Sequence, residues 1–122
     1  MRVLLDTHTF VWWDNDELPR AVRDRIRLAD TVYVSAMSAW EVTIKTALGK
    51  ITARAAFADA IEDYGFDAFP ITVAHADAVR ALPPHHRDPF DRLLVVQAQL
   101  EGLTLVSRDP AMRLYTVPVV WA

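Results

Sequence analysis

Short, strongly apolar segments alternate along this chain with longer segments of helical periodicity. The short segments are predicted strands, because they are rich in β-branched and aromatic side chains and too short for ordinary helices. We predict five strands, at Arg2–Leu5, Thr31–Ala36, Phe66–Ile71, Leu103–Val106 and Val117–Trp121. Pro118 interrupts the last one, which places it at an edge, since proline cannot donate to a sheet ladder. The alternation predicts a three-layer α/β/α sandwich with a mainly parallel five-stranded sheet.

The segments between the strands have recognisable helix signals. We predict that helices start near Thr9 and span Pro19–Ala29, Ser38–Leu48, Ala53–Tyr64, Val73–Leu82 and Asp88–Leu100. Ser38 and Glu41 have the spacing of a capping box, and Asp88 before Pro89 is typical of a helix start. Trp40, Ile44 and Leu48 recur at helical spacing and are expected to form one apolar stripe.

Length and composition limit the classes of protein that this chain can be. The 122 residues, with no repeat or linker, predict one domain spanning 1–122, and 52% hydrophobic residues argue against disorder. No apolar run approaches the roughly 18 residues of a membrane helix, and no secretion signal follows Met1, so we expect a cytoplasmic protein. The chain has no cysteine, so a metal site must use oxygen or nitrogen ligands.

The net charge of −3 argues against a module that binds nucleic acid through a general basic field. It argues less strongly against a nuclease. Metal ions held in an acidic pocket invert the local sign of the charge and can receive phosphates directly.

Four carboxylates lie where a predicted strand ends or where the next helix begins: Asp6, Glu41, Asp91 and Asp109. The carboxyl ends of parallel strands share one edge of the sheet, so these residues can meet there in one acidic pocket. Like charges at close range repel, and a hard divalent cation with oxygen ligands offsets that repulsion. The pattern therefore indicates a divalent metal site.

Each of these carboxylates also has an ordinary structural explanation. Asp6 and Asp109 can cap helices, and a negative charge at Asp91 is favoured near a helix N-terminus. Glu41 can complete the capping box or pair with Lys45 four residues later. From spacing alone, one metal site and four independent structural roles carry about equal weight.

Four stretches of the chain resemble, in order and over nearly its whole length, the PIN-domain ribonucleases, and most closely the VapC-type toxins of bacterial toxin–antitoxin pairs. They are LLDTHTFVWW, VSAMSAWEVTIKTALGK, PPHHRDPFDRLLVVQAQLEG and TLVSRD, and the segment HHRDPFDRLLVVQAQ is the most specific. The resemblance implies a Mg²⁺-dependent endoribonuclease, with Mn²⁺ as a possible alternative ion. The family's set of four acidic residues falls on Asp6, Glu41, Asp91 and Asp109. Asp109 matches the fourth acid, which is the least regular member of the set in the family.

The resemblance also implies a role for each of these residues. Asp6 and Asp91 would bind the ion directly, Glu41 directly or through water, and Asp109 as an outer ligand. A water activated by the ion would attack the phosphodiester in line, which requires no histidine base. Thr7 and Ser107 would orient water or ligands. The family further implies an RNA substrate, a small cognate antitoxin and a homodimer.

Two cationic residues lie near these acids in the sequence. Lys45 and Arg92 could contact phosphate, although an ion pair with Glu41 and a solvated helix face are the favoured explanations. The adjacent His85 and His86 point in different directions, so we expect a loop role for them, which could be near the substrate, and no zinc site.

The tryptophans Trp12, Trp13 and Trp40 are expected in the core. Consecutive helical residues cannot both point inward, so one of Trp12 and Trp13 could lie at a dimer interface.

Three other classes of α/β protein are alternatives to a nuclease. A receiver-type signalling domain would have paired acids after the first strand and a lysine after the last, but the chain has Asp6-Thr7 and no lysine beyond Lys50. An aspartyl phosphatase would need a second acid where His8 stands. The third alternative is a non-catalytic α/β module that only binds a partner.

Overall fold

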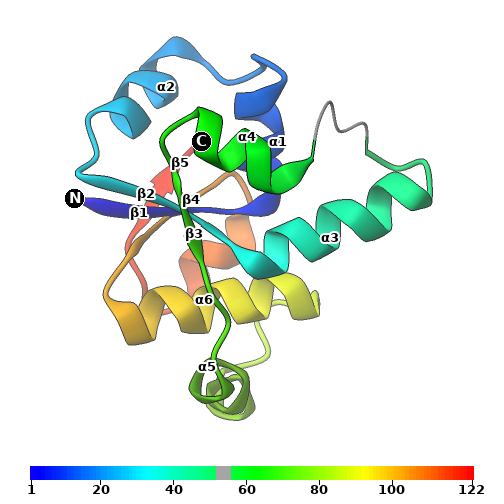
Figure 1. Cartoon of the computed structure of the whole chain (residues 1–122). Helices are drawn as coiled ribbons and strands as arrows, with labels where there is room; N and C mark the ends of the chain where they lie inside the picture. Colours follow the sequence, from blue (N-terminus) through cyan, green and yellow to red (C-terminus); the bar gives the residue numbers. More distant parts are fainter. Residues whose placement is uncertain (52–55) are drawn as a thin grey trace.

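Five parallel strands form the central sheet of the computed structural model, which describes residues 1–51 and 56–122 (Figure 1). The strands are β1 (Arg2–Leu5), β2 (Thr31–Ser35), β3 (Asp67–Phe69), β4 (Thr104–Ser107) and β5 (Val119–Trp121). Their order is β3-β2-β1-β4-β5, and all four neighbouring pairs are parallel. The five predicted strands are confirmed, with β3 and β5 shorter than expected and β5 at an edge.

The strand order determines where a ligand can bind. The chain runs from β1 outward to β2 and β3, then returns to the other side of β1 to form β4 and β5. Receiver domains have the order 2-1-3-4-5, so the receiver alternative is wrong for this chain. The direction of winding reverses between β1 and β4, and in open α/β sheets ligands bind at the carboxyl ends of the strands beside such a reversal.

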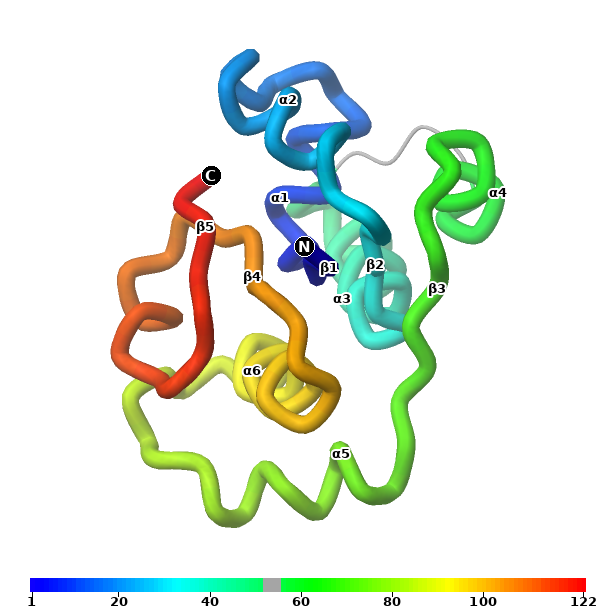
Figure 2. Tube along the Cα trace, turned by 90° about the vertical axis from the view of Figure 1, so that its left-hand side faces the viewer, coloured from blue at the N-terminus to red at the C-terminus, as the bar shows by residue number. Residues whose placement is uncertain are grey.

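Helices cover both faces of the sheet (Figures 1 and 2). On one face lie α1 (Thr7–Asp14), α2 (Arg20–Arg27) and α4 (Phe57–Asp63). On the other lie α3 (Ala36–Ala47) and α6 (Pro89–Glu101), and α5 (Val73–Ala78) packs on α6. The short 3₁₀ helices η1 (Val79–Ala81) and η2 (Pro110–Leu114) follow α5 and β4.

Alternation of side chains along the strands creates two cores. Val3 and Leu5 of β1 pack with α1, α2 and α4, whereas Leu4 between them packs with α3 and α6. Both clusters consist of buried hydrophobic residues, one on each face of the sheet. The predicted three-layer sandwich is therefore confirmed.

Two carboxylates that the sequence offers as helix caps do form caps. Asp6 caps α1, with Oδ1 accepting from the backbone N–H of Thr9 at 2.8 Å, so this helix begins earlier than predicted. Asp88 caps α6 in the same way, and α6 ends at Gly102, which has a φ of 68°. The predicted start of a helix at Ala53 lies outside the described residues. No helix in the described ranges is long and apolar enough to cross a membrane.

The predicted start of α3 is wrong. Ser35 caps this helix, because its hydroxyl accepts from the backbone N–H of Met37 at 3.1 Å. Ser38 therefore lies inside the helix, and the capping box of Ser38 and Glu41 does not form. The buried face of α3 contains Ser38 and Glu41, whereas Trp40, which points away from that face, is 62% exposed, and Leu48 at the C-terminal end of the helix is 64% exposed. The expected placement of Trp40 in the core is also wrong.

Candidate metal centre

A pocket of about 430 Å³ lies at the carboxyl ends of β1 and β4, where the strand order reverses. Three of the four predicted carboxylates reach it. Its lining consists of Asp6, His8, Trp12, His86, Asp88, Asp91, Arg108 and Asp109. The sheet topology thus brings together acids that are up to 103 positions apart in the sequence.

Asp6 forms the floor of the pocket and is only 6% exposed. Its Oδ1 caps α1, and its Oδ2 accepts a hydrogen bond of 2.6 Å from the hydroxyl of Ser107. Burial raises the pKa of Asp6, while the hydrogen bonds from Ser107 and Thr9 oppose that rise. Helix capping and a role in the pocket are therefore compatible, because the two oxygens of Asp6 serve different partners.

Ser107 links Asp6 to Asp109. Its Oγ accepts from the backbone N–H of Asp109 at 3.1 Å while its hydroxyl donates to Asp6. Asp109 in turn caps η2, since its Oδ1 accepts from the backbone N–H of Ala111 at 2.9 Å. The turn after β4 is therefore held so that Oδ2 of Asp109 remains available to other groups in the pocket.

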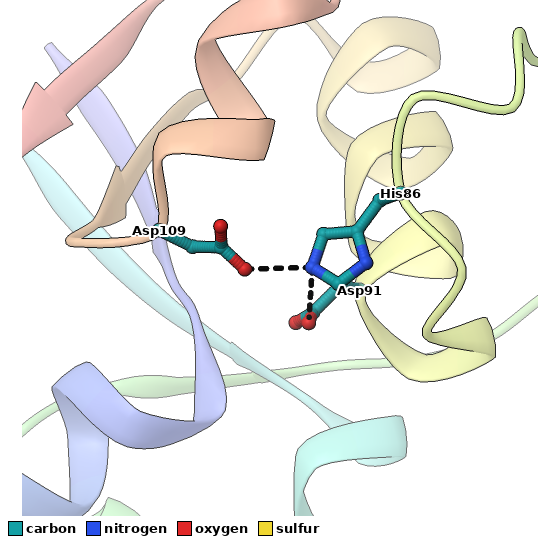
Figure 3. Close-up of side chains that lie close together, drawn as sticks. All are labelled: His86, Asp91 and Asp109. Atoms are coloured by element: carbon teal, nitrogen blue, oxygen red, sulfur yellow. Dashed lines mark hydrogen bonds and ion pairs between the residues drawn. The ribbon is translucent and has the colours of Figure 1, made fainter.

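Asp91 and Asp109 meet at the imidazole of His86 (Figure 3). Nε2 of His86 lies 2.6 Å from Oδ2 of Asp109 and 3.0 Å from Oδ2 of Asp91. One ligand atom from each of the three residues lies within 4.8 Å of the others, a spacing that suits a metal ion. His86 belongs to the loop before α6, Asp91 to the first turn of α6, and Asp109 to the turn after β4.

Asp91 is a carboxyl group whose charged form is disfavoured in the metal-free pocket, first by burial and then by the neighbouring acids. Burial raises the pKa of Asp91 to about 7, with repulsion from Asp88, Asp6 and Glu41 adding to the rise and His86 opposing it. A divalent cation would relieve both causes, because it neutralises the carboxylates and replaces their lost hydration with direct bonds. The residues present therefore fit an oxygen-ligated metal ion.

Glu41 is not one of the residues that line the pocket, and it is only 2% exposed. Its Oε1 accepts from the hydroxyl of Thr7 at 2.6 Å, and Thr7 Oγ1 lies 2.9 Å from Ser38 Oγ. Its Oε2 pairs with Nζ of Lys45 at 2.5 Å. The predicted ion pair of Glu41 and Lys45 is confirmed, and Thr7 is a second hydrogen-bond partner of this acid.

Arg92 has neither of its predicted roles. Its guanidinium donates to four backbone carbonyls at 3.1–3.3 Å, those of Val79, Leu82, Pro83 and His86. The side chain is therefore engaged in fixing the loop that carries His86 onto α6, and it is neither a solvated residue of a helix face nor free to bind phosphate.

Several residues of the pocket were not predicted from the sequence as site residues. His86 was expected to have a loop role that could be near the substrate and was not named as a site residue, although it lies five positions before Asp91 in the segment HHRDPFDR. Trp12 was expected in the core or at a dimer interface; it lines the pocket, whereas Trp13 is buried. The i,i+4 spacing of His8 and Trp12 was the available signal for a shared helix face.

Comparison with known proteins agrees with this architecture. Residues 3–117 match the family model of the PIN domain. The chain is 30% identical over 132 aligned residues to ribonuclease VapC22 of Mycobacterium tuberculosis, with 98% of each protein covered. Its fold is similar to that of VapBC2 from Rickettsia felis, which was solved bound to a DNA fragment from its promoter. The TM-score is 0.76 at 14% sequence identity, and the match covers 100% of this chain and 99% of that chain. It is also similar to a toxin–antitoxin complex from Klebsiella pneumoniae, with a TM-score of 0.66, 18% identity and coverage of 97% and 95%. The chain therefore belongs to the PIN domain family.

Proposed function

We propose that this protein is a VapC-type, metal-dependent endoribonuclease and the toxin of a toxin–antitoxin pair, and that residues 1–122 act as one domain. The observation that carries the proposal is the convergence of Asp6, Asp91 and Asp109 in one pocket at the switch between β1 and β4. The full-length similarity to a protein named as a ribonuclease supports RNA as the substrate.

In this proposal, Asp6 and Asp91 bind the ion directly, and Asp109 is an outer ligand. Glu41 contributes to the metal site indirectly, through Thr7 or through a water. A bound divalent ion would supply an activated water and stabilise negative charge on the phosphoryl group. Oxygen ligands support Mg²⁺, with Mn²⁺ as the alternative.

The remaining residues of the centre prepare the carboxylates. Ser107 fixes the orientation of Asp6 through its hydroxyl, and Lys45 balances the charge of the buried Glu41. His86 draws Asp109 toward Asp91. Ligands that are oriented before the ion arrives lose less conformational freedom on binding it.

We also propose two protein partners. The likeness in fold to toxin–antitoxin complexes supports a small antitoxin that covers the pocket. A homodimer is supported by the exposed apolar face of α3, where Trp40 packs edge-on against Phe90 and Leu48 is open to solvent. The interface then involves Trp40 in place of Trp12 or Trp13, and a monomeric mass by light scattering would refute it. The proposed place of action is the cytoplasm.

The first experiment is cleavage of total and transfer RNA by the purified protein with Mg²⁺, Mn²⁺ or EDTA. Asp6→Asn should abolish the metal-dependent cleavage. Asp77→Asn is a matched control, because Asp77 is an exposed residue of α5 outside the pocket lining, and should cleave like the wild type. Cleavage that persists in EDTA or in Asp6→Asn would refute the metal-centred assignment. A folded wild type that binds metal but cleaves no RNA would favour the partner-binding module.

A further inference from the structure

Part of the pocket lining is aromatic and cationic. His8, Trp12 and Arg108 line the same pocket as Asp6, Asp91 and Asp109, but none of them contributes a carboxylate. His8 and Trp12 lie one turn apart on α1, and Arg108 directly follows β4. The start of α1 and the turn after β4, which carry Asp6 and Asp109, are therefore also close in sequence to these three side chains.

These side chains form a platform in which Arg108 lies over Trp12 and the ring of His8 is tilted by 41° from that of Trp12. The guanidinium carbon of Arg108 lies 4.1 Å from the centre of the Trp12 ring, and the ring of His8 lies 5.8 Å from that of Trp12. Nε of Arg108 donates to the carbonyl of Ala122 at 2.9 Å, which holds the guanidinium over the indole. Trp12 is half-buried, while His8 and Arg108 are exposed. The platform is therefore held in place and reachable from solvent.

Other arginines that stack on tryptophans in this protein have different surroundings. Arg23 lies over Trp13, but it pairs with Asp16 at 3.2 Å and donates to the carbonyl of Trp13. Arg108 makes no ion pair with any residue in the described ranges, although the pocket beside it is acidic. Its charge is thus available to a ligand.

The chemistry of the platform fits a nucleotide. Unstacked RNA bases bind to aromatic rings and to guanidinium planes, and arginine also pairs with phosphate. The flat, exposed surface at Trp12 and Arg108 suits the face of a base, which the charged side chains of a peptide do not offer. A nucleotide presents a neutral flat base to the platform while its phosphate lies at the metal centre.

We propose that Trp12 and Arg108, with His8 at the edge, form a subsite that stacks one base of single-stranded RNA next to the phosphate at the carboxylates. The subsite rests on the proposed ribonuclease function, and it adds a specific place for the base that flanks the cleaved bond.

The test measures binding of a fluorescently labelled single-stranded RNA oligonucleotide in the presence of Mg²⁺. Asp91→Asn is used as the background so that the RNA stays intact. Adding Trp12→Ala or Arg108→Ala should raise the Kd about tenfold, and Trp12→Phe should restore most of the affinity, since a phenyl ring still stacks. Arg113→Ala is the matched control, because Arg113 lies 4.0 Å over Trp121 outside the pocket lining and should leave the Kd unchanged.

Removing single bases from the RNA identifies the stacked position. One abasic site should weaken binding as much as Trp12→Ala does, and it should have no further effect in the Trp12→Ala protein. Arg108→Ala removes an exposed side chain, so it remains informative if Trp12→Ala fails to fold.

The outcomes separate the subsite from the nuclease function. A wild type that cleaves RNA, with unchanged Kd in Trp12→Ala and Arg108→Ala, would overturn the subsite alone. A wild type that binds RNA through Trp12 but cleaves none would refute the nuclease and keep the subsite. Loss of antitoxin binding in these variants, with RNA binding unchanged, would also overturn the subsite.

Discussion

His86 and Asp109 are joined by a contact of 2.6 Å between Nε2 and Oδ2, and the proton in this contact belongs to the histidine. Nδ1 of His86 accepts from the backbone N–H of Asp88 at 3.0 Å, so Nδ1 carries no proton. Nε2 therefore carries it and donates to Asp109, with Asp91 3.0 Å away. A nitrogen that donates in this way cannot bind a cation at the same time. His86 thus holds the two carboxylates together, although its position within the cluster would also suit a ligand.

Replacement of His86 by alanine should weaken metal binding without abolishing it. Residues that orient ligands typically contribute about 10–100-fold to metal affinity, so calorimetric titration with Mn²⁺ should give a Kd higher by roughly that factor. His85→Ala is the control, since His85 is exposed, packs on Tyr115 and is not one of the residues that line the pocket. A loss of binding as complete as that in Asp91→Asn would instead identify His86 as a direct ligand.

Replacement of Asp91 by asparagine should abolish RNA cleavage and leave the fold intact. The amide is neutral, so it removes the repulsion that Asp91 shares with Asp88 and Asp6. In EDTA at neutral pH the variant should therefore melt at a temperature equal to or above that of the wild type. Retained cleavage by the pure variant, or a clear fall in melting temperature, would contradict the assignment.

The metal-free protein should lose stability as the pH rises from about 5 to about 7.5. The pKa of Asp91 is raised to about 7 in the folded protein from an ordinary value of 3.8. Between these values the folded state holds a proton that the unfolded state has released, so raising the pH favours unfolding. The expected loss is about 2–3 kcal/mol, measured by urea denaturation in EDTA.

Two further measurements check the origin of this pH dependence. Saturating Mg²⁺ at pH 7.5 should recover the stability, because the cation takes over the role of the proton. Asp91→Asn should flatten the profile. A wild-type stability that rises steadily over this pH range would show that Asp91 is already ionised at pH 5.

Replacement of Lys45 by methionine should destabilise the protein by about 2 kcal/mol, because it leaves the charge of Glu41 buried without a partner. Chemical denaturation of the variant and of Lys50→Met would check this, since Lys50 is exposed and should be neutral. If Lys45 instead served to bind phosphate, Lys45→Met would raise the KM for RNA and leave the free energy of unfolding unchanged.

The sequence by itself was sufficient to predict the layers of the fold and the place of most of the acidic residues at one edge of the sheet. Hydrophobic periodicity is a local property, so strands and helices could be assigned from it, and alternation of the two required parallel strands. Once the strands were parallel, residues that follow them had to share one edge. Asp6 and Asp109 could therefore be placed at the same site without any knowledge of loop structure.

The start of α3 depended on pairing between strands. Ser35 and Ser38 are both suitable caps, and the local sequence does not distinguish them. In the structure β2 pairs with β3 as far as Ser35, opposite Phe69, and α3 begins at the next residue. This register then rotates α3 so that Glu41 is buried and Trp40 is exposed.

Tertiary structure alone decided the roles of His86, Arg92, Trp12 and Arg108. His86 meets Asp109 across 23 residues because Arg92 binds the carbonyls of the loop that carries it. Trp12 meets Arg108 because α1 begins and β4 ends at the same edge of the sheet. Such contacts depend on how loops close between elements, and local periodicity carries no information about that closure.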